Sequence, residues 1–468
     1  MLLLFVACTP PEPTLTATPS SGSSSGYYAV SFDLAQSGVA PDAVLGLTVG
    51  GVDAYDLQAD GDTLTAYVQG AAEPGAAAVE LRTAEDTLVF PDVFTYDRPA
   101  DPVFDRMVAV GASLTMGVES AAITDRSALV GPMAALARAG GAYFALPLLI
   151  PDVFAPMTPA DVGPPPGCDS PDMSSFTADS ATDAIARMVD PETGAFGYEF
   201  VRVSPDLVPR DLGVAGMDVH EQVDGPENLA ANLLAHLVYD PYGELGAALP
   251  ASPVQLATEV SPTLIASPDL LGNDVLDAIT DGEPFDASLV TPREDFKPKL
   301  EEVVGGLAAT GAEVFLANLP SPRGLPVAAD RRRQTLAAGT ATAEDMDAQL
   351  AEIDTITADY NQLLVDTAAA YPNVHVVDLA AEVERLRAEP LVVQGETLDP
   401  DRFGGLISLD GVHFSDTGYA SVANLFVRAI NDTLGAAVPE LDLDAVAATD
   451  PYLPSALRAA GLDVDACE

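Results

Sequence analysis

The sequence predicts two folded domains, a small all-β sandwich followed by a larger α/β domain with a largely parallel sheet. Three observations predict this. The chain has 468 residues, more than one hydrophobic core usually serves. Over residues 27–98, short runs of alternating apolar and polar residues are separated by turn residues, as in a β-sandwich. Over residues 102–435, strand-like runs alternate with helix-like runs, which is typical of an α/β domain.

The chain begins with a short apolar run, MLLLFVAC, and a polar segment follows it. The run resembles the lipobox at which bacterial lipoprotein precursors are cut and acylated on cysteine, so residues 1–8 are expected to be a signal remnant with a lipidated Cys8. Residues 9–26 are rich in Ser, Thr and Pro, and we expect them to form a flexible tether. The resemblance implies a bacterial cell-envelope location, as an outer-membrane lipoprotein that is periplasmic or surface-exposed.

Two further cysteines, Cys168 and Cys467, form an even pair in a chain expected to be exported. Because the envelope is oxidising, we predict a disulfide between them. Their wide spacing in the sequence leaves their distance in space open.

Acidic residues outnumber basic ones, 71 to 20, and the net charge is −51. Such a charge disfavours broad contact with nucleic acid or anionic lipid, so no nucleic-acid partner is expected. A solvated acidic surface suited to a salty medium is the simplest interpretation, against a polyanion that serves a cationic partner. No His/Cys cluster has metal-ligand spacing, so neither a metal nor another cofactor is expected. We expect a monomer.

In the first domain, strands are expected over residues 29–32, 47–49, 63–68, 79–81 and 93–96, with Gly-Gly, Asp-Gly-Asp and Pro-Gly turns between them. The segments VGGVDA, PGAAAVELRT and FTYD resemble the immunoglobulin-like domains of the IPT/TIG family. The resemblance implies a β-sandwich that serves as a spacer, a docking surface or a carbohydrate-binding module. It assigns no chemistry to this domain.

In the second domain, buried strands are expected over residues 106–110 and 263–266. A helix with Leu300, Val303 and Leu307 on one face leads into a strand over 313–318, and a helix around 353–363 leads into a strand over 374–378. The Pro-rich, apolar residues 146–173 are expected to cover one end of the sheet. Residues 436–468 are expected to form an acidic tail with a short helix near 454–460.

The first of these strands ends in VAVGASLTMG, which contains Ser113. Ligands bind at the carboxyl ends of the strands in open α/β sheets, so this serine is a candidate site residue. A phosphate loop would need more glycine and usually a lysine, and the Gly-x-Ser-x-Gly elbow would need glycine where Thr115 stands. Taken alone, the segment is most simply a strand-to-helix turn without chemistry.

Near the C-terminus, SLDGVHFSDTGYA places Asp410 three residues before His413, ahead of a helix expected to start near Ser415 or Asp416. A catalytic histidine needs a carboxylate on Nδ1, which leaves Nε2 free to take a proton from a serine. An aspartate three residues away in one loop can reach Nδ1. The alternatives are an ordinary Asp-Gly turn and a capped loop histidine.

Two further segments could supply an oxyanion hole, which needs hydrogen-bond donors that converge on one point. LGVAGM offers the amide of Gly216, and LLGND offers the side chain of Asn273. Each also has a simple structural interpretation, as a turn glycine and as a helix cap.

In their order along the chain, GASLTMG, LGVAGM, LLGND and DGVH resemble the four blocks of the SGNH/GDSL hydrolase family. The resemblance implies a three-layer, flavodoxin-like domain with a parallel sheet and a carboxylic ester hydrolase activity. It makes Ser113 the nucleophile, His413 the base and Asp410 the residue that orients the base. The amides of Ser113 and Gly216 and the side chain of Asn273 would stabilise the oxyanion.

The segments depart from the family pattern at two places. Ala112 replaces the aspartate of the GDSL motif, and Gly272 directly precedes Asn273, whereas the family usually has this glycine one residue earlier. Four residues are candidates for lining the pocket: Ala112, Leu114, His220 and Asp274. His236 and His375 are expected to be structural.

The combined hypothesis is a serine esterase or lipase that hydrolyses acyl lipid or acetylated carbohydrate through an acyl-enzyme. The apolar residues 146–157 favour an acyl chain as the substrate group. The alternative is a cell-surface binding or adhesion lipoprotein whose hydrolase fold is inactive.

Overall fold

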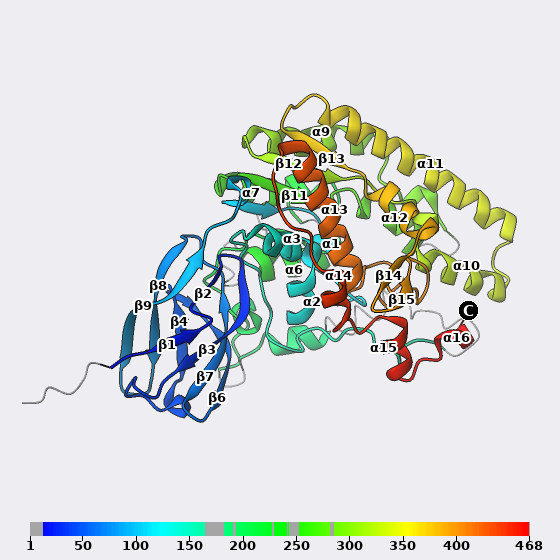
Figure 1. Cartoon of the computed structure of the whole chain (residues 1–468). Helices are drawn as coiled ribbons and strands as arrows, with labels where there is room; N and C mark the ends of the chain where they lie inside the picture. The colour runs from blue at the N-terminus through cyan, green and yellow to red at the C-terminus, as the bar shows by residue number, and fades with distance from the viewer. Residues whose placement is uncertain are drawn as a thin grey trace, which may run out of the picture. The chain divides into compact units, whose positions relative to one another are not determined.

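A computed structural model describes residues 13–163, 182–190, 193–226, 229–240, 242, 252–280 and 285–467. The chain divides into two compact units, Met1–Pro99 and Ala100–Glu468 (Figure 1). Cys8, Cys168 and the side chain of Cys467 lie outside the described residues, and so do residues 164–181 of the predicted cover. The lipid anchor and the disulfide therefore stay predictions.

The first unit consists of two β-sheets that share one core. One sheet has the order β1-β3-β7-β6 and the other the order β2-β9-β8-β4-β5. Alternate side chains such as Val30, Phe32, Leu47 and Val79 point inward and are fully buried in a single cluster. All five segments predicted as strands lie in these sheets. The strand bounds are β1 Thr16–Thr18, β2 Ser21–Ser23, β3 Gly26–Asp33, β4 Gly46–Val49, β5 Val52–Asp53, β6 Tyr55–Asp60, β7 Thr63–Gln69, β8 Gly75–Arg82 and β9 Thr87–Asp97.

The prediction of a flexible tether over residues 9–26 is wrong for the described part of that segment. Strand β1 pairs with β3, and β2 pairs with β9. Leu15 and Ala17 are buried in the core of the sandwich, while Thr14, Thr16 and Thr18, which alternate with them, are exposed. This alternation over five residues is enough for an edge strand, because backbone pairing supplies its hydrogen bonds.

The second unit is built on a parallel sheet with the strand order β10-β11-β12-β13. These strands are Met107–Ala109, Leu264–Ser267, Glu313–Ala317 and Val374–Val377, at the four predicted positions. Asp211 bridges Ala109 in parallel, since Ala109 N donates to Arg210 O at 2.9 Å and Leu212 N donates to Ala109 O at 3.0 Å. Counting this segment, which lies on the side of β10 opposite to β11, the order becomes 2-1-3-4-5, as in flavodoxin-like sheets.

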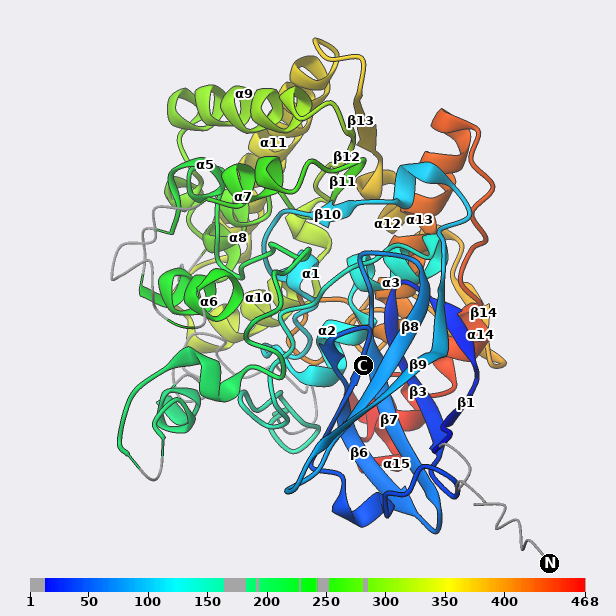
Figure 2. The same cartoon turned by 90° about the vertical axis from the view of Figure 1, so that its left-hand side faces the viewer.

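Helices cover both faces of this sheet, which makes three layers (Figure 2). On one face, alternate strand residues such as Val108, Ile265 and Val314 share a core with helices α7, α8, α9 and α11. Helices α3 and α13 pack against each other on the other face. The helix bounds are α1 Ser113–Met116, α2 Asp125–Val130, α3 Pro132–Gly140, α5 Glu221–Asp224, α6 Leu229–Tyr239, α7 Pro253–Glu259, α8 Asn273–Thr280, α9 Arg293–Ala309, α10 Pro326–Ala338, α11 Ala343–Ala368, α12 Leu379–Ala388 and α13 Asp416–Leu434.

The prediction of an acidic tail over residues 436–468 is wrong, because this segment packs on the α/β unit. It contains α14 (Leu443–Ala447), α15 (Pro454–Ala459) and α16 (Val464–Cys467), and α15 confirms the short helix predicted there. Apolar residues spaced among the acids, such as Leu453 and Leu457, are buried against other parts of the unit, including the β14–β15 hairpin (Leu391–Val393 and Glu396–Leu398).

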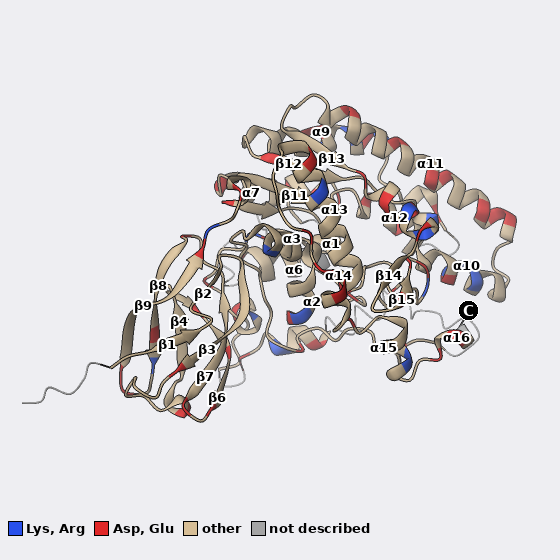
Figure 3. Cartoon of the chain, viewed as in Figure 1, with Lys and Arg blue, Asp and Glu red and all other residues tan. Residues whose placement is uncertain are grey.

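The acidic residues are spread over many elements, and α11 contains several of them along its length (Figure 3). Among the helices that the structure describes, none combines the length and the apolar character needed to cross a membrane.

Three carboxylates, those of Glu119, Asp416 and Asp450, are buried near one another. Arg126 contacts Glu119 at 3.0 Å and also contacts Asp416. Burial and the neighbouring Asp416 raise the pKa of Asp450 to about 6, and burial likewise raises the pKa of Glu119 well above its usual range. Asp450 accepts the Thr417 amide at 2.8 Å, so the C-terminal segment is tied to the start of α13 through a carboxyl group with a raised pKa.

We expect the free energy of unfolding to fall as the pH rises from about 4 to about 7. A carboxyl group with a raised pKa binds more protons in the folded state, so its favourable contribution is lost when it ionises. A shift of about two pKa units corresponds to about 3 kcal/mol between about pH 4 and about pH 7. Urea unfolding of Asp450→Asn should lack this part of the decrease, while Asp442→Asn, an exposed helix cap nearby, should keep it. An unchanged pH dependence in Asp450→Asn would contradict the assignment.

Candidate active site

Ser113 is the first residue of α1 and follows the carboxyl end of β10 by a short turn. The predicted strand-to-helix turn is therefore present. Gly111 has φ +146°, and a Cβ at this position would collide with Thr115 Oγ1 and Asp269 Oδ1. Gly117 ends α1 in the left-handed conformation, with φ +79°. Glycine is thus required on the strand side of the serine for backbone conformation and for the close approach of two side chains.

The loop before α13 holds His413 against Asp410. His413 Nδ1 lies 2.7 Å from Asp410 Oδ2. The amides of Val412 and His413 donate to Oδ1 at 2.8 and 2.9 Å, and the Ala121 amide donates to Oδ2 at 2.7 Å. With both carboxylate oxygens occupied in this way, the imidazole ring has a defined orientation, and Nδ1 is the nitrogen that carries the proton.

Burial acts to raise the pKa of Asp410, but the attraction of His413 and the hydrogen bonds from His413 and Val412 outweigh it, so the pKa lies below its usual value. Asp410 is therefore ionised at neutral pH. His413 Nε2 is buried and has no hydrogen-bond partner among the described residues, Ser113 included. That nitrogen is available to a substrate or to a hydroxyl group that moves into reach.

The segment that follows α1 is hydrogen-bonded to the histidine loop, although they lie far apart in the sequence. The Ser120 amide donates to Ser408 Oγ at 2.9 Å, and the Leu409 amide donates to Ser120 Oγ at 3.2 Å. Ser120 and Ala121 have φ values of +49° and +62°, a conformation uncommon outside glycine. This turn directs the Ala121 amide at Asp410, so the serine and histidine segments hold each other in place.

Asn273 begins α8, just beyond β11, and its Nδ2 donates to Met217 O at 2.8 Å. The bond places the Asn273 side chain against the segment that contains Gly216, which has φ +87°. One N–H of the Asn273 amide is used in this bond, and the second stays available as a donor. The altered position of Gly272 does not move Asn273 away from the site, since both residues line the same cavity as Ser113.

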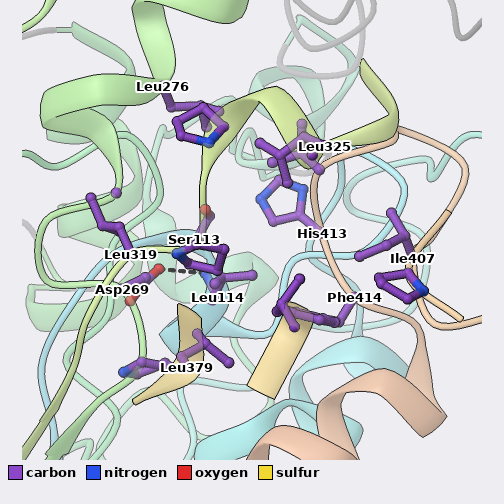
Figure 4. Close-up of a pocket in the computed structure, with 18 of the residues that line it drawn as sticks. Ser113, Leu114, Asp269, Leu276, Leu319, Leu325, Leu379, Ile407, His413 and Phe414 are labelled. Atoms are coloured by element: carbon purple, nitrogen blue, oxygen red, sulfur yellow. Dashed lines mark hydrogen bonds between the residues drawn. The ribbon is translucent and has the colours of Figure 1, made fainter. Parts of the chain in front are cut away.

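A cavity of about 100 Å³ opens at the carboxyl ends of the strands, and Ser113, Asn273 and His413 all line it (Figure 4). Its other walls come mainly from segments that follow β11, β12 and β13 and from the loop that bears His413. Most of the side chains in these walls are apolar, and they include Leu114, Leu276, Leu319, Leu325, Leu379, Ile407, Val412 and Phe414. The cavity therefore joins a polar end, where the candidate reacting groups lie, to a mostly apolar wall.

Of the four predicted pocket residues, Leu114 lines this cavity and the other three do not. Ala112 is buried in the turn, His220 precedes α5, and Asp274 is buried with its Oδ2 bound to the Val219 amide at 3.0 Å. Gly216 is exposed and is not among the lining residues. The described residues 146–157 do not line the cavity either. The argument that these apolar residues favour an acyl chain as the substrate group is therefore wrong.

Sequence reasoning missed Asp269 and most of the apolar wall. Asp269 is the second residue after β11, lines the cavity and is 3% exposed. Its position at the carboxyl end of a predicted parallel strand was the available signal. The apolar wall residues carried no such signal, because leucines of the core and leucines of a cavity look alike in a sequence.

Within the described part of the chain, no group of three or more His, Cys, Asp or Glu side chains is arranged to hold a metal ion. The chemistry that these residues support is nucleophilic: a serine on a helix start, a histidine held by a carboxylate, and an amide donor in one cavity.

No known protein family's sequence profile matches the chain, and no curated protein matches it. Among solved structures, it is similar to a carbohydrate acetylesterase from Xanthomonas citri, with 13% sequence identity and a TM-score of 0.18. The match covers 70% of this chain and 66% of that one, just under two thirds of the acetylesterase's length. A likeness this weak carries no argument, so any functional conclusion depends on the site itself.

Proposed function

We propose that the protein is an SGNH-type serine hydrolase that cleaves carboxylic esters through an acyl-enzyme. The observation that carries this proposal is the His413–Asp410 pair, whose Nδ1–Oδ2 distance is 2.7 Å. Its unpartnered Nε2 is buried, and His413 shares a cavity with Ser113. In Figure 4 the His413 ring and the Ser113 side chain lie near each other at this cavity.

In the proposed reaction, Ser113 Oγ attacks the ester carbonyl while His413 Nε2 takes its proton. Asp410 stabilises the imidazolium that forms. The tetrahedral intermediate collapses as His413 returns the proton to the leaving alcohol, which leaves the acyl group on Ser113. A water molecule, deprotonated by His413, then releases the acid and restores the serine.

The negative charge on the tetrahedral oxygen needs donors, and we assign them to the Ser113 amide and to Asn273 Nδ2, since both residues line the cavity. Asn273→Ala should lower kcat by about 10²–10³, the usual cost of one oxyanion donor. Steady-state hydrolysis of an aryl ester measures this. Asn318→Ala is the matched control, because Asn318 also follows a strand of the sheet but bonds Asp378 at 2.8 Å and does not line the cavity. Equal activity of the two variants would remove Asn273 from the mechanism.

The apolar wall supports an ester whose acyl part is a short hydrocarbon chain, in preference to acetylated carbohydrate. Each methylene buried against that wall should raise kcat/KM about fourfold, from about 0.8 kcal/mol per methylene. A series of aryl esters from acetate to decanoate, set beside acetate release from an acetylated polysaccharide, tests this. A maximum beyond acetate supports the acyl-chain substrate, and a maximum at acetate with release from the polysaccharide contradicts it.

The resemblance of residues 1–8 to a lipobox supports a lipid anchor on Cys8, in an outer-membrane lipoprotein. The resemblance of residues 27–98 to IPT/TIG domains supports a spacer or binding role for the β-sandwich. Mass spectrometry of the N-terminal peptide from the native host tests the first proposal, since an unmodified Cys8 in that peptide contradicts it.

A further inference from the structure

Helix α1 starts without a capping residue of its own. Its N-cap, Ala112, has no side-chain hydrogen bond to the helix, although first-turn amides have no partner within a helix and usually bind a Ser, Thr, Asp or Asn at that position. Asp269 supplies the acceptor from the end of β11. It accepts the Ala112 amide at 3.0 Å and the Leu114 amide at 2.6 Å, the latter drawn as a dashed line in Figure 4.

Thr115 completes this contact. Its hydroxyl donates to Asp269 Oδ1 at 2.6 Å, and its amide lies 3.4 Å from Oδ2. Both oxygens of Asp269 are therefore bound by donors from the serine turn. Among the described residues no Lys or Arg is paired with Asp269, which is 3% exposed. A buried carboxylate without a cation is costly, so its position suggests a role that an apolar residue could not fill.

The backbone amide of Ser113 differs from the neighbouring amides in its hydrogen bonding. The amides on both sides of Ser113 bind Asp269, and the amide of Ser113 is the one in the run 112–115 that does not. The hydrogen bonds of the amides before and after Ser113 hold the backbone that carries Oγ. The Ser113 amide itself does not bind the carboxylate. Gly111 makes this possible, since a Cβ there would collide with Asp269 Oδ1.

We propose that Asp269 is a positioning residue for Ser113, which holds the serine turn from the neighbouring strand so that Oγ and the Ser113 amide face the substrate together. This proposal rests on the proposed ester hydrolysis at Ser113. It predicts an effect on the chemical step, because a displacement of about 1 Å of a reacting group costs about 10²-fold in rate. It predicts little effect on substrate binding, because Asp269 contributes little to the apolar wall.

The test is Asp269→Asn in the full chain. The new NH₂ group would face amide or hydroxyl donors on one side of the turn, so kcat for an aryl ester should fall about 10²-fold while KM changes less than about threefold. The rate at which a fluorophosphonate labels Ser113 should fall in parallel. Thr115→Val removes only the hydroxyl contact and should lower kcat by a smaller factor, about threefold to tenfold.

Two comparisons separate positioning from general damage. Asp286→Asn changes another capping aspartate, which is half-buried and bonds the Ser288 amide at 2.9 Å, and its kinetics should match the wild type. A melting temperature of Asp269→Asn near that of the wild type shows that a fall in kcat is local. Three results would overturn the proposal. They are a wild-type kcat in both Asp269→Asn and Thr115→Val, an effect on KM alone, and a loss of activity that is explained by unfolding of the variant. If the wild-type protein is not labelled at Ser113, the proposed hydrolase function fails instead.

Discussion

Replacing Ser113 with alanine should nearly abolish ester hydrolysis, lowering kcat/KM by about 10⁴–10⁶. Without Oγ the enzyme has no nucleophile. A water molecule would have to attack the ester carbonyl, at a site arranged for attack by the serine oxygen. The apolar wall and Asn273 remain, so substrate should still bind and a small residual rate should persist. Hydrolysis of a short-chain aryl ester and labelling by a fluorophosphonate both measure the loss.

The folded state should not change, because Ser113 is only half-buried and Asp269 holds its turn through the amides of Ala112 and Leu114. Ser288→Ala, at an exposed turn, should keep wild-type hydrolysis and labelling. Full activity in Ser113→Ala would mean that another residue is the nucleophile, and that the cavity in Figure 4 is not the site of ester cleavage.

Asp410→Asn should lower kcat by about 10³–10⁴ and leave KM nearly unchanged. Asp410 accepts four bonds: the amides of Val412 and His413 on one oxygen, and the Ala121 amide and His413 Nδ1 on the other. In Asp410→Asn, an NH₂ group replaces one of the two carboxylate oxygens. If the NH₂ faces His413, Nδ1 must give up its proton and Nε2 carries it, so the base is blocked.

Rates of aryl ester hydrolysis measured across pH test this, because the variant should stay impaired at every pH where Asp410 is ionised in the wild type. Asp378→Asn is the control: it also follows a strand of the sheet and caps α12 by accepting the Ala381 amide at 3.1 Å, and it should be fully active. Wild-type rates in Asp410→Asn would show that His413 does not need this carboxylate.

Much of the fold could be predicted from the sequence because local patterns decide it. The parallel strands and the helices around Leu300 and Ile353 follow from runs and periods that lie within about twenty residues. The segments with Ser113, Asn273, Asp410 and His413 could be located because each has a short residue pattern, and the structure brings three of these residues to one cavity, with Asp410 bound to His413.

Other features depend on which segments meet in space, and no local pattern carries that information. Residues 14–18 and 436–467 look polar or acidic in composition, yet a few spaced apolar side chains find partners in distant strands and helices and become buried. The missing cap of α1 is supplied by Asp269, 157 positions away from Ala112. The leucines of the cavity wall are likewise brought together only by the sheet.

By itself, the sequence determined the α/β class and the positions of the candidate nucleophile, base and donor, because strand ends and short motifs are local. Only the tertiary structure decided which apolar side chains form the cavity and which carboxylate holds the serine turn. Those contacts join residues far apart in the chain, and their energy depends on burial and distance, which exist only once the sheet has formed.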